Sequence, residues 1–374
     1  MWFRRLRCLS IRTVTPASVG AVLALAAMSP SLAWAAGWVG RSLPAPRGSA
    51  DSVLMGVSCV SAQHCVAVGG PDDSPGAVLV ERWNGTRWSI EAVRQPAGTE
   101  QGLLRAVSCT PSSACLAVGA TRARTGAWSG LVERLAAGRW SFAAARKRAW
   151  WAASWLDAVS CTTPSACMAV GRYEDRAGVS FPLAERWDGS RWHIQPAGRI
   201  PYGELEGVSC TSADSCTAVG TDVSSQLIER WNGRRWSMVT APGTGSDETS
   251  LRAISCTAGR ACTAVGESVI VDVASFPLAE RWNGITWSRQ LPVRPQVGDL
   301  DGVSCGSQTS CTAVGPGELI ERWNGQRWSV QQPANGTPEE TLYGVSCLSA
   351  KVCTAVGSTI DSAGREVPLA QTLG

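Results

Sequence analysis

One short motif recurs seven times along this chain of 374 residues and restricts its fold more than any other feature. The first copy is LMGVSCVSAQHCVAVGG, residues 54–70, in which a second cysteine follows six positions after the first. In every copy the second cysteine leads into Ala-Val-Gly, and successive copies start 42 to 52 residues apart. Repeats of this length with short strand patterns are typical of β-propeller blades.

A second motif fills the other half of each repeat. ERWNGTRWS begins at Glu81, and close variants begin at Glu185, Glu229, Glu280 and Glu321. A sixth copy at Glu133, ERLAAGRWS, lacks the first tryptophan and the Asn-Gly pair. Each repeat therefore has the pattern of four strands, A to D, written LxGVSC, CxAVG, LxERW and RWS. Asn-Gly predicts a tight turn between strands C and D, and the flanking tryptophans can pack across that hairpin.

The two ends of the chain complement each other. The last repeat ends with VPLAQTLG, residues 367–374, which matches strand C and is followed by no strand D. The segment AGWVGRSLP, residues 36–44, precedes the first repeat at the spacing of a strand D. We therefore expect one all-β domain over residues 36–374, a seven-bladed propeller of four-stranded antiparallel blades. The N-terminal strand would join the last blade, which closes the ring and removes two exposed sheet edges.

The first 35 residues have the pattern of an export signal. A basic start is followed by the apolar run AVLALAAM at 21–28 and by the cleavage pattern Ala-Trp-Ala at 33–35; the basic residues are Arg4, Arg5, Arg7 and Arg12. We therefore expect a secreted or otherwise extracytoplasmic protein, with the general and twin-arginine export routes left open. The apolar run is too short to span a bilayer, and no later stretch is long enough, so we expect no membrane span after cleavage.

Charge argues against a nucleic-acid partner. The whole chain carries a formal charge of +4, and its signal contains four arginines, so the mature chain is close to neutral. A near-neutral domain lacks the basic excess that polyanion binding requires. We expect a monomer without a nucleic-acid partner.

The cysteines admit three interpretations. Of fifteen, Cys8 lies in the signal, and the other fourteen form seven local pairs. Redox sites usually have the spacing Cys-x-x-Cys, and a zinc site would need nitrogen ligands that only His64 and His193 could supply. Export favours disulfides, each stabilising by roughly 2 kcal/mol in the entropy model. We predict seven disulfides, no metal and no cofactor; the pairs are Cys59–Cys65, Cys109–Cys115, Cys161–Cys167, Cys210–Cys216, Cys256–Cys262, Cys305–Cys311 and Cys347–Cys353.

The turn between strands C and D resembles the Asp-box of sialidase-like (BNR) propellers. That box ends in Asp-x-Gly-x-Thr-Trp; here Asn84, Asp188, Asn232, Asn283 and Asn324 stand at the Asp position, and the opening Ser is absent. The box is a structural turn, so this resemblance implies fold only. The whole repeat also resembles the Cys-stapled propeller repeats of secreted bacterial proteins, a resemblance that covers nearly all of the mature chain and implies no particular function.

Few residues suggest catalysis. The chain contains no HExxH, GxSxG or phosphate-binding glycine loop. A sialidase would need three arginines, a Tyr–Glu pair and an acid, and only three tyrosines exist: Tyr173, Tyr202 and Tyr343. The recurring Glu-Arg of strand C could form a ring of charge. We interpret it instead as packing or ion pairing between neighbouring sheets, since adjacent strand residues face opposite sides.

Sequence variation points to one face of the ring. The A–B and C–D turns are nearly uniform, whereas the B–C connections on the opposite face range from Pro-Gly at 316–317 to GRYEDRAGVSF at 171–181. Insertions on one face of a repeat protein often mark its binding surface. On the same face, ARKRAWWAASW at 145–155 replaces the usual linker and brings basic and aromatic residues together. The candidate binding residues are Arg146, Lys147, Arg148, Trp150, Trp151, Trp155, Tyr173 and Asp175.

These tryptophans also have a structural interpretation, in which they fill the interface between blades 2 and 3, where Leu135 replaces a tryptophan. Three functions remain open. The first is a non-enzymatic binding or scaffold module for an extracellular glycan or protein. The second is a carbohydrate-active enzyme, sialidase-like or a lyase, with its acids on the B–C loops at Asp72, Asp73, Glu174 and Asp175. The third is a purely structural surface protein.

Overall fold

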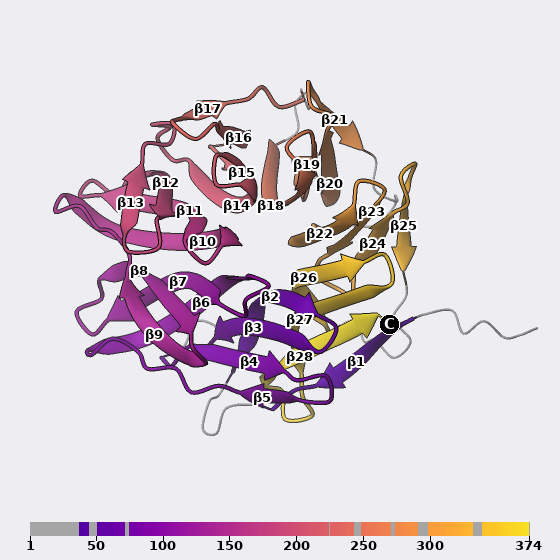
Figure 1. Ribbon diagram of the computed structural model, residues 1–374, viewed down its shortest axis with the longest axis horizontal. Coiled ribbons are helices and arrows are strands. Elements are labelled where there is room, and N and C mark those ends of the chain that lie inside the picture. Colours follow the sequence, from indigo (N-terminus) through magenta and orange to yellow (C-terminus); the bar gives the residue numbers. More distant parts are fainter. Residues whose placement is uncertain are drawn as a thin grey trace, which may run out of the picture. The chain divides into compact units, whose positions relative to one another are not determined.

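The computed structural model describes residues 37–44, 51–71, 75–223, 225–242, 248–270, 274–290, 298–331 and 339–373. Within these ranges the chain is all-β, and seven four-stranded antiparallel sheets surround one axis (Figure 1). This confirms the predicted propeller. No helix in the described part is long and apolar enough to cross a membrane. The expected export signal, residues 1–35, and the candidate acids Asp72 and Asp73 lie outside the described residues.

The strands follow the repeat in chain order, four to a blade. Blade 1 consists of β2 (Val53–Ser61), β3 (His64–Gly70), β4 (Leu79–Trp83) and β5 (Trp88–Ile90). Blade 2 consists of β6 (Thr99–Cys109), β7 (Cys115–Ala123), β8 (Trp128–Ala136) and β9 (Arg139–Ala144). Blade 3 consists of β10 (Trp151–Thr163), β11 (Ala166–Asp175), β12 (Ser180–Trp187) and β13 (Trp192–Gln195). Blade 4 consists of β14 (Glu204–Ser212), β15 (Ser215–Thr221), β16 (Gln226–Trp231) and β17 (Trp236–Met238).

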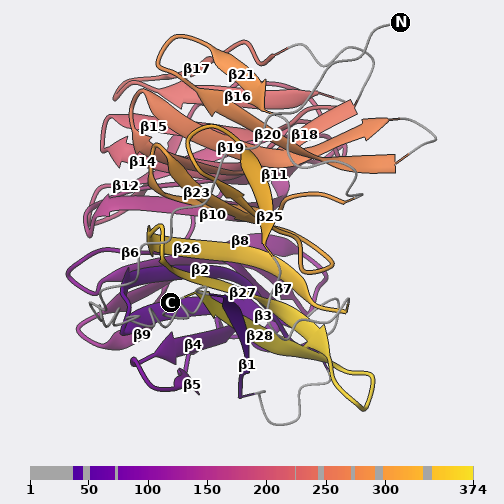
Figure 2. The same cartoon turned by 90° about the vertical axis from the view of Figure 1, so that its right-hand side faces the viewer.

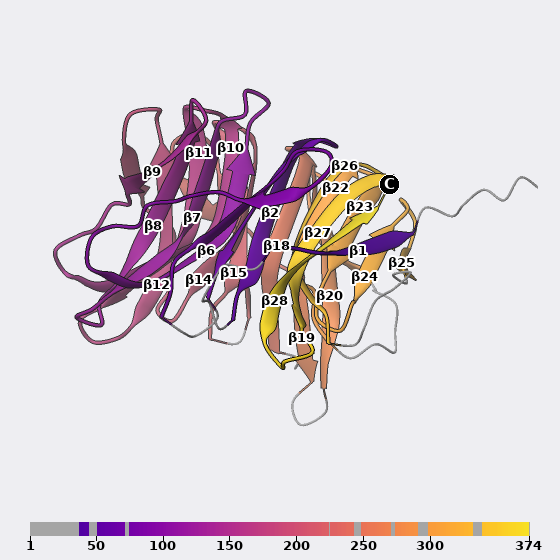
Figure 3. The same cartoon turned by 90° about the horizontal axis from the view of Figure 1, so that it is seen from below.

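Blade 5 consists of β18 (Glu248–Ala258), β19 (Ala261–Ile270), β20 (Ala274–Trp282) and β21 (Trp287–Gln290). Blade 6 consists of β22 (Gly302–Ser307), β23 (Ser310–Val314), β24 (Ile320–Trp323) and β25 (Trp328–Gln331). Blade 7 combines β26 (Thr341–Ser349), β27 (Val352–Ile360) and β28 (Glu366–Leu373) with the N-terminal β1 (Trp38–Ser42). The side views show how the N-terminal β1 reaches the C-terminal blade (Figure 2, Figure 3).

The ring is closed by antiparallel pairing of β1 with β28, in register from Trp38 opposite Leu373 to Ser42 opposite Leu369. Trp38 is 1% exposed and packs in the same hydrophobic cluster as Leu369 and Leu373. The predicted strand from the N-terminus therefore completes the last blade, and both chain ends are tied into one sheet.

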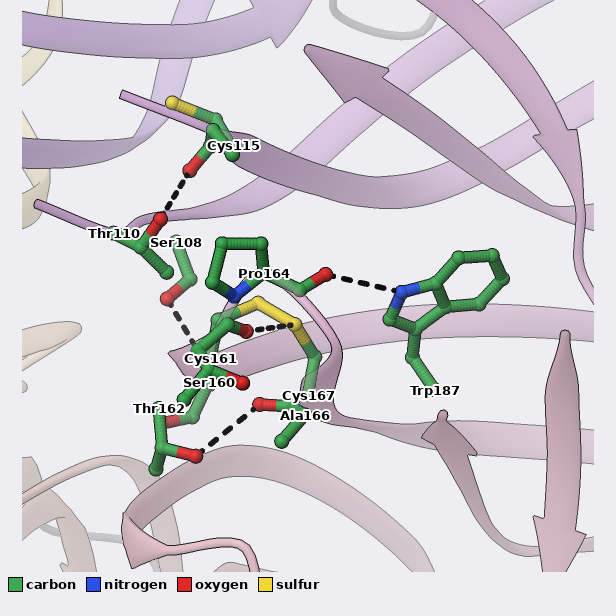
Figure 4. The surroundings of a disulfide bond; sticks show 12 residues. Ser108, Thr110, Cys115, Ser160, Cys161, Thr162, Pro164, Ala166, Cys167 and Trp187 are labelled. Carbon is green, nitrogen blue, oxygen red and sulfur yellow. Dashed lines mark hydrogen bonds between the residues drawn. A yellow bond between two sulfur atoms is a disulfide. The ribbon is translucent and has the colours of Figure 1, made fainter. Parts of the chain in front are cut away.

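Every predicted cysteine pair forms a disulfide between strands A and B of its own blade. The two cysteines lie directly opposite each other in the ladder, with Cα atoms 3.9–4.1 Å apart. Figure 4 shows the Cys161–Cys167 bond beside the turn that it spans. The disulfides thus fix seven equivalent hairpins, as the spacing predicts.

A ring of hydrogen bonds joins each blade to the next. The serine of each Val-Ser-Cys or Ile-Ser-Cys accepts the backbone N–H of the first cysteine in the following blade, as Ser108 does from Cys161 at 2.9 Å (Figure 4). All seven junctions have this bond, including the closing one from Cys59 to Ser346. The uniform serine is therefore an interblade contact, which explains why no repeat replaces it.

The C–D turns are tight, but their Asn-Gly pair does not form a two-residue type I′ turn, because among the described residues the glycine has a positive φ and the asparagine does not. Asn84 Oδ1 accepts the N–H groups of Thr86 and Arg87 at 3.0 Å, and Gly85 has a positive φ of 93°. The flanking tryptophans pack at 5.5–5.9 Å between ring centroids in the five blades that carry both. Blade 2 instead uses a two-residue turn, Ala137-Gly138, in which both φ values are positive. This is the requirement of a type I′ hairpin.

The Glu-Arg pair of strand C is structural. Its glutamates are at most 1% exposed, and its arginines reach the next blade, where Arg281 lies 4.6 Å from the Trp323 ring and donates to the carbonyl of Gln308. The two side chains point to opposite sides of the sheet, as alternation requires. Blade 7 carries the neutral amide of Gln371 at the glutamate position, also fully buried.

Candidate functional site

Strand A of each blade turns one variable side chain toward the axis of the ring. In LxGVSC the leucine is fully buried in all seven blades, and in six of them a β-bulge follows it. A bulge leaves one residue unpaired and can re-aim its side chain. The residue x sits at this point, and its seven occupants line one cavity of about 630 Å³: Met55, Arg105, Asp157, Glu206, Arg252, Asp301 and Tyr343. Since every blade contributes, this cavity lies at the centre of the ring.

Two further variable positions surround each bulge. One residue precedes the buried leucine and the other follows Ala-Val-Gly on strand B, and they pair across the ladder, as Glu204 does with Thr221 and Ser250 with Glu267. The intervening glycine allows these two strands to approach closely, because a Cβ on Gly171 would lie 2.2 Å from the Trp155 carbonyl oxygen. We call the cavity lined by these three positions the channel mouth; it opens on the face of the B–C and D–A connections.

The channel mouth is charged on one side and apolar on the other. Blades 3 to 6 contribute all six of its carboxylates, Asp157, Glu204, Glu206, Glu267, Asp299 and Asp301, against three arginines, Arg105, Arg172 and Arg252. Toward blades 1 and 2 it adjoins a second cavity of about 480 Å³, which shares Met55, Arg105 and Tyr343. This second cavity adds the apolar and aromatic residues Val53, Leu103, Ala120, Trp128 and Trp155 and the polar residues Gln101 and Arg122. The site therefore combines an acidic wall with a wall of apolar and aromatic side chains that also carries Arg105 and Arg122.

The arginines hold most of the acids in ion pairs. Arg252 contacts Asp301 at 2.6 Å and Glu267 at 2.7 Å, and it also contacts Asp299. Arg172 contacts Glu204 at 2.7 Å, and Arg105 lies 3.3 Å from Asp157. Six carboxyl groups line the wall against three arginines, so the arginines are too few to pair with every acid one to one.

Glu206 is the acid without such a partner among the described residues. Burial, reinforced by the neighbouring charge of Glu204, raises the pKa of Glu206 to about 8. This carboxyl is therefore largely protonated near neutral pH and would ionise if a cation were placed beside it. Among the acids of the channel mouth, Glu206 is therefore the one whose ionisation we expect a cationic ligand to change.

Aromatic rings border the acidic wall. The guanidinium of Arg172 lies 4.5 Å from the centroid of the Trp155 ring, and Trp155 in turn lies 6.1 Å from Trp128. Trp155 thus lines the cavity that adjoins the channel mouth and not the patch in which we expected it. Trp155 lies four positions after Trp151 on β10, which corresponds to about 13 Å along a strand.

The other predicted site residues gather above blade 3. Trp150 is 44% exposed, whereas Trp151 is 4% exposed and packs in one cluster with Leu116 and Val118 of blade 2. Trp151 stacks on Tyr173 with a centroid distance of 4.5 Å. Trp151 thus fills the interface between blades 2 and 3, as the structural interpretation expects, whereas the Trp150 ring is exposed at the surface.

Among the polar candidate residues, the three basic side chains are exposed, whereas Asp175 has a structural role in its own turn. Arg146, Lys147 and Arg148 have exposed side chains, and the backbone N–H of Arg146 donates to Glu185. Asp175 caps its own turn by accepting the N–H groups of Ala177 and Val179. Neither Asp175 nor Glu174 lines the channel mouth, so the described acids of the B–C loops do not meet there.

Sequence reasoning expected a ligand on this face, near the channel mouth, but missed the residues that line the mouth, although the sequence contains their signal. The residue between Leu and Gly or Ala in strand A differs in almost every repeat, while its neighbours hardly change. A freely varying position inside a uniform strand marks a side chain without a common packing role.

No protein-family model matches the chain, and no curated protein matches it either. Solved structures do. "YCF48 bound to D1 peptide" matches with a TM-score of 0.59 at 12% identity, over 90% of this chain and 97% of that one. "YCF48 from Cyanidioschyzon merolae" gives 0.55 at 14%, over 90% and 99%. The "WD40 beta propeller domain of Doa1" gives 0.56 at 12%, over 90% and 97%. At these identities the likeness shows the fold alone, a β-propeller.

Proposed function

We propose that this protein is a non-enzymatic binding module of the extracytoplasmic space that holds an extended, positively charged peptide segment of a partner protein in the channel mouth. The observation that carries this proposal is the acidic wall of the channel mouth beside the adjoining cavity, whose lining combines apolar and aromatic side chains with Gln101, Arg105 and Arg122. Seven disulfides agree with an oxidising compartment, and so does the expected export signal at residues 1–35.

The two walls fit a peptide that alternates basic and apolar side chains. Lysine or arginine of the ligand would face Glu206 and Glu204, while its apolar side chains would meet Met55 and Tyr343. Charge complementarity of this kind gives specificity and faster association more than raw affinity. A solved relative in fold, YCF48, is described as bound to a peptide, which supports the peptide as ligand class.

We expect cationic peptides to bind more tightly as the pH rises from about 6 to about 8.5, because binding a cation beside Glu206 requires its carboxyl to lose a proton. The measurement is fluorescence anisotropy with labelled 12-residue peptides of equal length that carry basic, neutral or acidic side chains between leucines. In Glu206→Gln the affinity for the basic peptide should fall about tenfold and the pH dependence should flatten.

The matched control is Asp214→Asn, which removes an exposed carboxylate from the A–B turn of the same blade on the opposite face. It should leave affinity unchanged. Equal binding of basic and acidic peptides, or a Glu206→Gln variant that binds like the unaltered protein, would overturn the proposal.

A second candidate function is carbohydrate cleavage, with Glu206 as the acid. It is favoured by one observation: a protonated carboxyl stands beside the ion-paired Glu204, as general acid catalysis requires. Release of reducing ends from a polysaccharide, abolished in Glu206→Gln, would establish this activity. Peptide binding without any such release would reject it.

A further inference from the structure

A second pocket lies on the same face, outside the channel mouth. It has a volume of about 190 Å³ and is formed by blade 3 together with the linkers before and after it. Its aromatic and polar lining residues are Arg148, Trp150, Trp151, Tyr173, Gln195 and Arg199. We propose that this blade-3 pocket binds one acidic sugar residue, a hexuronic acid. The site shares no lining residue with the channel mouth and does not depend on peptide binding there.

The aromatic wall of the blade-3 pocket is fixed by stacking. Trp151 lies nearly parallel to Tyr173, at an interplanar angle of 11°, and Tyr173 stacks on Phe181 at 5.4 Å. Trp150 stands edge-on to Tyr173, with 5.3 Å between centroids. Trp150 is thus the exposed ring of a rigid cluster, and a rigid ring loses little conformational entropy when a ligand packs against it.

The polar lining is basic. Arg148 and Arg199 line the pocket with exposed side chains, and among the described residues neither guanidinium forms an ion pair. Arg199 lies 6.0 Å from the Phe181 ring, which keeps it beside the aromatic cluster. The lining includes no carboxylate, in contrast to the channel mouth. A guanidinium binds a carboxylate through two parallel hydrogen bonds, so these arginines suit a ligand with one carboxylate.

The size of the pocket restricts the ligand to one ring. Drug-sized ligands occupy sites of roughly 300–1,000 Å³, and this pocket is smaller. A sugar ring offers C–H groups to an aromatic face and hydroxyls to the amide of Gln195.

The test is isothermal titration of the mature protein with trigalacturonic acid and with the matched neutral sugar galactotriose. We expect saturable binding of the acidic trisaccharide and at least fivefold weaker binding of the neutral one. Trp150→Ala and Arg199→Gln should each weaken the acidic sugar at least fivefold. The controls are Phe142→Ala, which removes a ring of matched exposure (46%) from β9, and Arg234→Gln, which removes an exposed cation from a C–D turn; both should bind as before.

Several outcomes would overturn the proposal: no binding of trigalacturonic acid, equal binding of both sugars, or unchanged binding in a Trp150→Ala variant whose thermal unfolding matches the unaltered protein. Tighter binding of a short oligothymidylate that is lost in the same variants would assign the pocket to nucleotides instead. Glu206→Gln should leave sugar binding intact, so failure of this proposal and failure of peptide binding can be told apart.

Discussion

The free energy of unfolding should fall as the pH rises from about 5 to about 8, opposite to the behaviour of proteins stabilised by ionised carboxylates. The cause is the buried glutamate of strand C. Burial raises the pKa of Glu81 to about 8 and that of Glu133 and Glu280 to about 7. At Glu81 and Glu133 neither carboxyl oxygen has a hydrogen-bond partner among the described residues.

The direction follows from where each state holds its proton. Below the usual glutamate pKa of 4.5 both folded and unfolded chains are protonated, and stability is greatest. Between pH 4.5 and about pH 8, Glu81 loses its proton in the unfolded chain but keeps it in the folded chain. The unfolded state is therefore stabilised relative to the folded state as the pH rises. Each pKa unit is worth about 1.4 kcal/mol, which sets a ceiling of about 5 kcal/mol for Glu81; we expect about 2.

Urea unfolding at about pH 5.5 and about pH 8.5 measures this effect. Glu81→Gln should stabilise the protein by about 2 kcal/mol at the higher pH and change little at the lower one. The chain itself shows that the amide is tolerated, since blade 7 buries Gln371 at the same position. Glu100→Gln, at an exposed glutamate, is the control and should leave both values unchanged. A stability that rises with pH over this range would contradict the account.

A single methyl group on the glycine of Ala-Val-Gly should be among the most damaging substitutions. In Gly171→Ala the new Cβ would lie 2.2 Å from the carbonyl oxygen of Trp155 and 2.9 Å from the Cα of Leu156. Both contacts are with backbone, so strands β10 and β11 would have to separate beside a fully buried leucine. We expect a loss of at least about 4 kcal/mol, or failure to fold.

Gly40→Ala is the matched control. Gly40 also lies in a strand, β1, and a Cβ there would have no atom within 4 Å. Because alanine has less freedom than glycine in the unfolded chain, this variant should be neutral or stabilised by up to about 1 kcal/mol. Thermal unfolding and the yield of folded protein measure both variants. Equal stabilities for the two would show that close approach of the strands does not require the glycine.

The fold could be predicted because its determinants are local and repeated seven times. The disulfides and the C–D turns depend on residues that are close in sequence. The shared strand of the last blade depends only on comparing the two chain ends. The interblade serine, as in Ser108, had an equally clear signal, but its partner lies 53 residues away and cannot be identified from spacing alone.

The site could be predicted only in part. The expected face carries both the channel mouth and the blade-3 pocket. The acids that meet at the axis do not come from the B–C loops: four of the six lie in strands, and Asp299 and Asp301 directly precede β22. A β-bulge decides this, because it turns Asp157 and Glu206 toward the axis, and a one-residue irregularity has no pattern of its own. Likewise, Trp150 and Trp155 are close in sequence, but the length of β10 places them in two different cavities.

Photo-crosslinking tests the proposed binding site most directly. A basic peptide with a benzophenone side chain at its centre would be irradiated with the mature protein, and the modified residues identified by mass spectrometry. Attachment to Met55, Tyr343 or their neighbours in the channel mouth, prevented by excess unlabelled peptide, is the predicted result. Attachment confined to the A–B and C–D turns of the opposite face would contradict it.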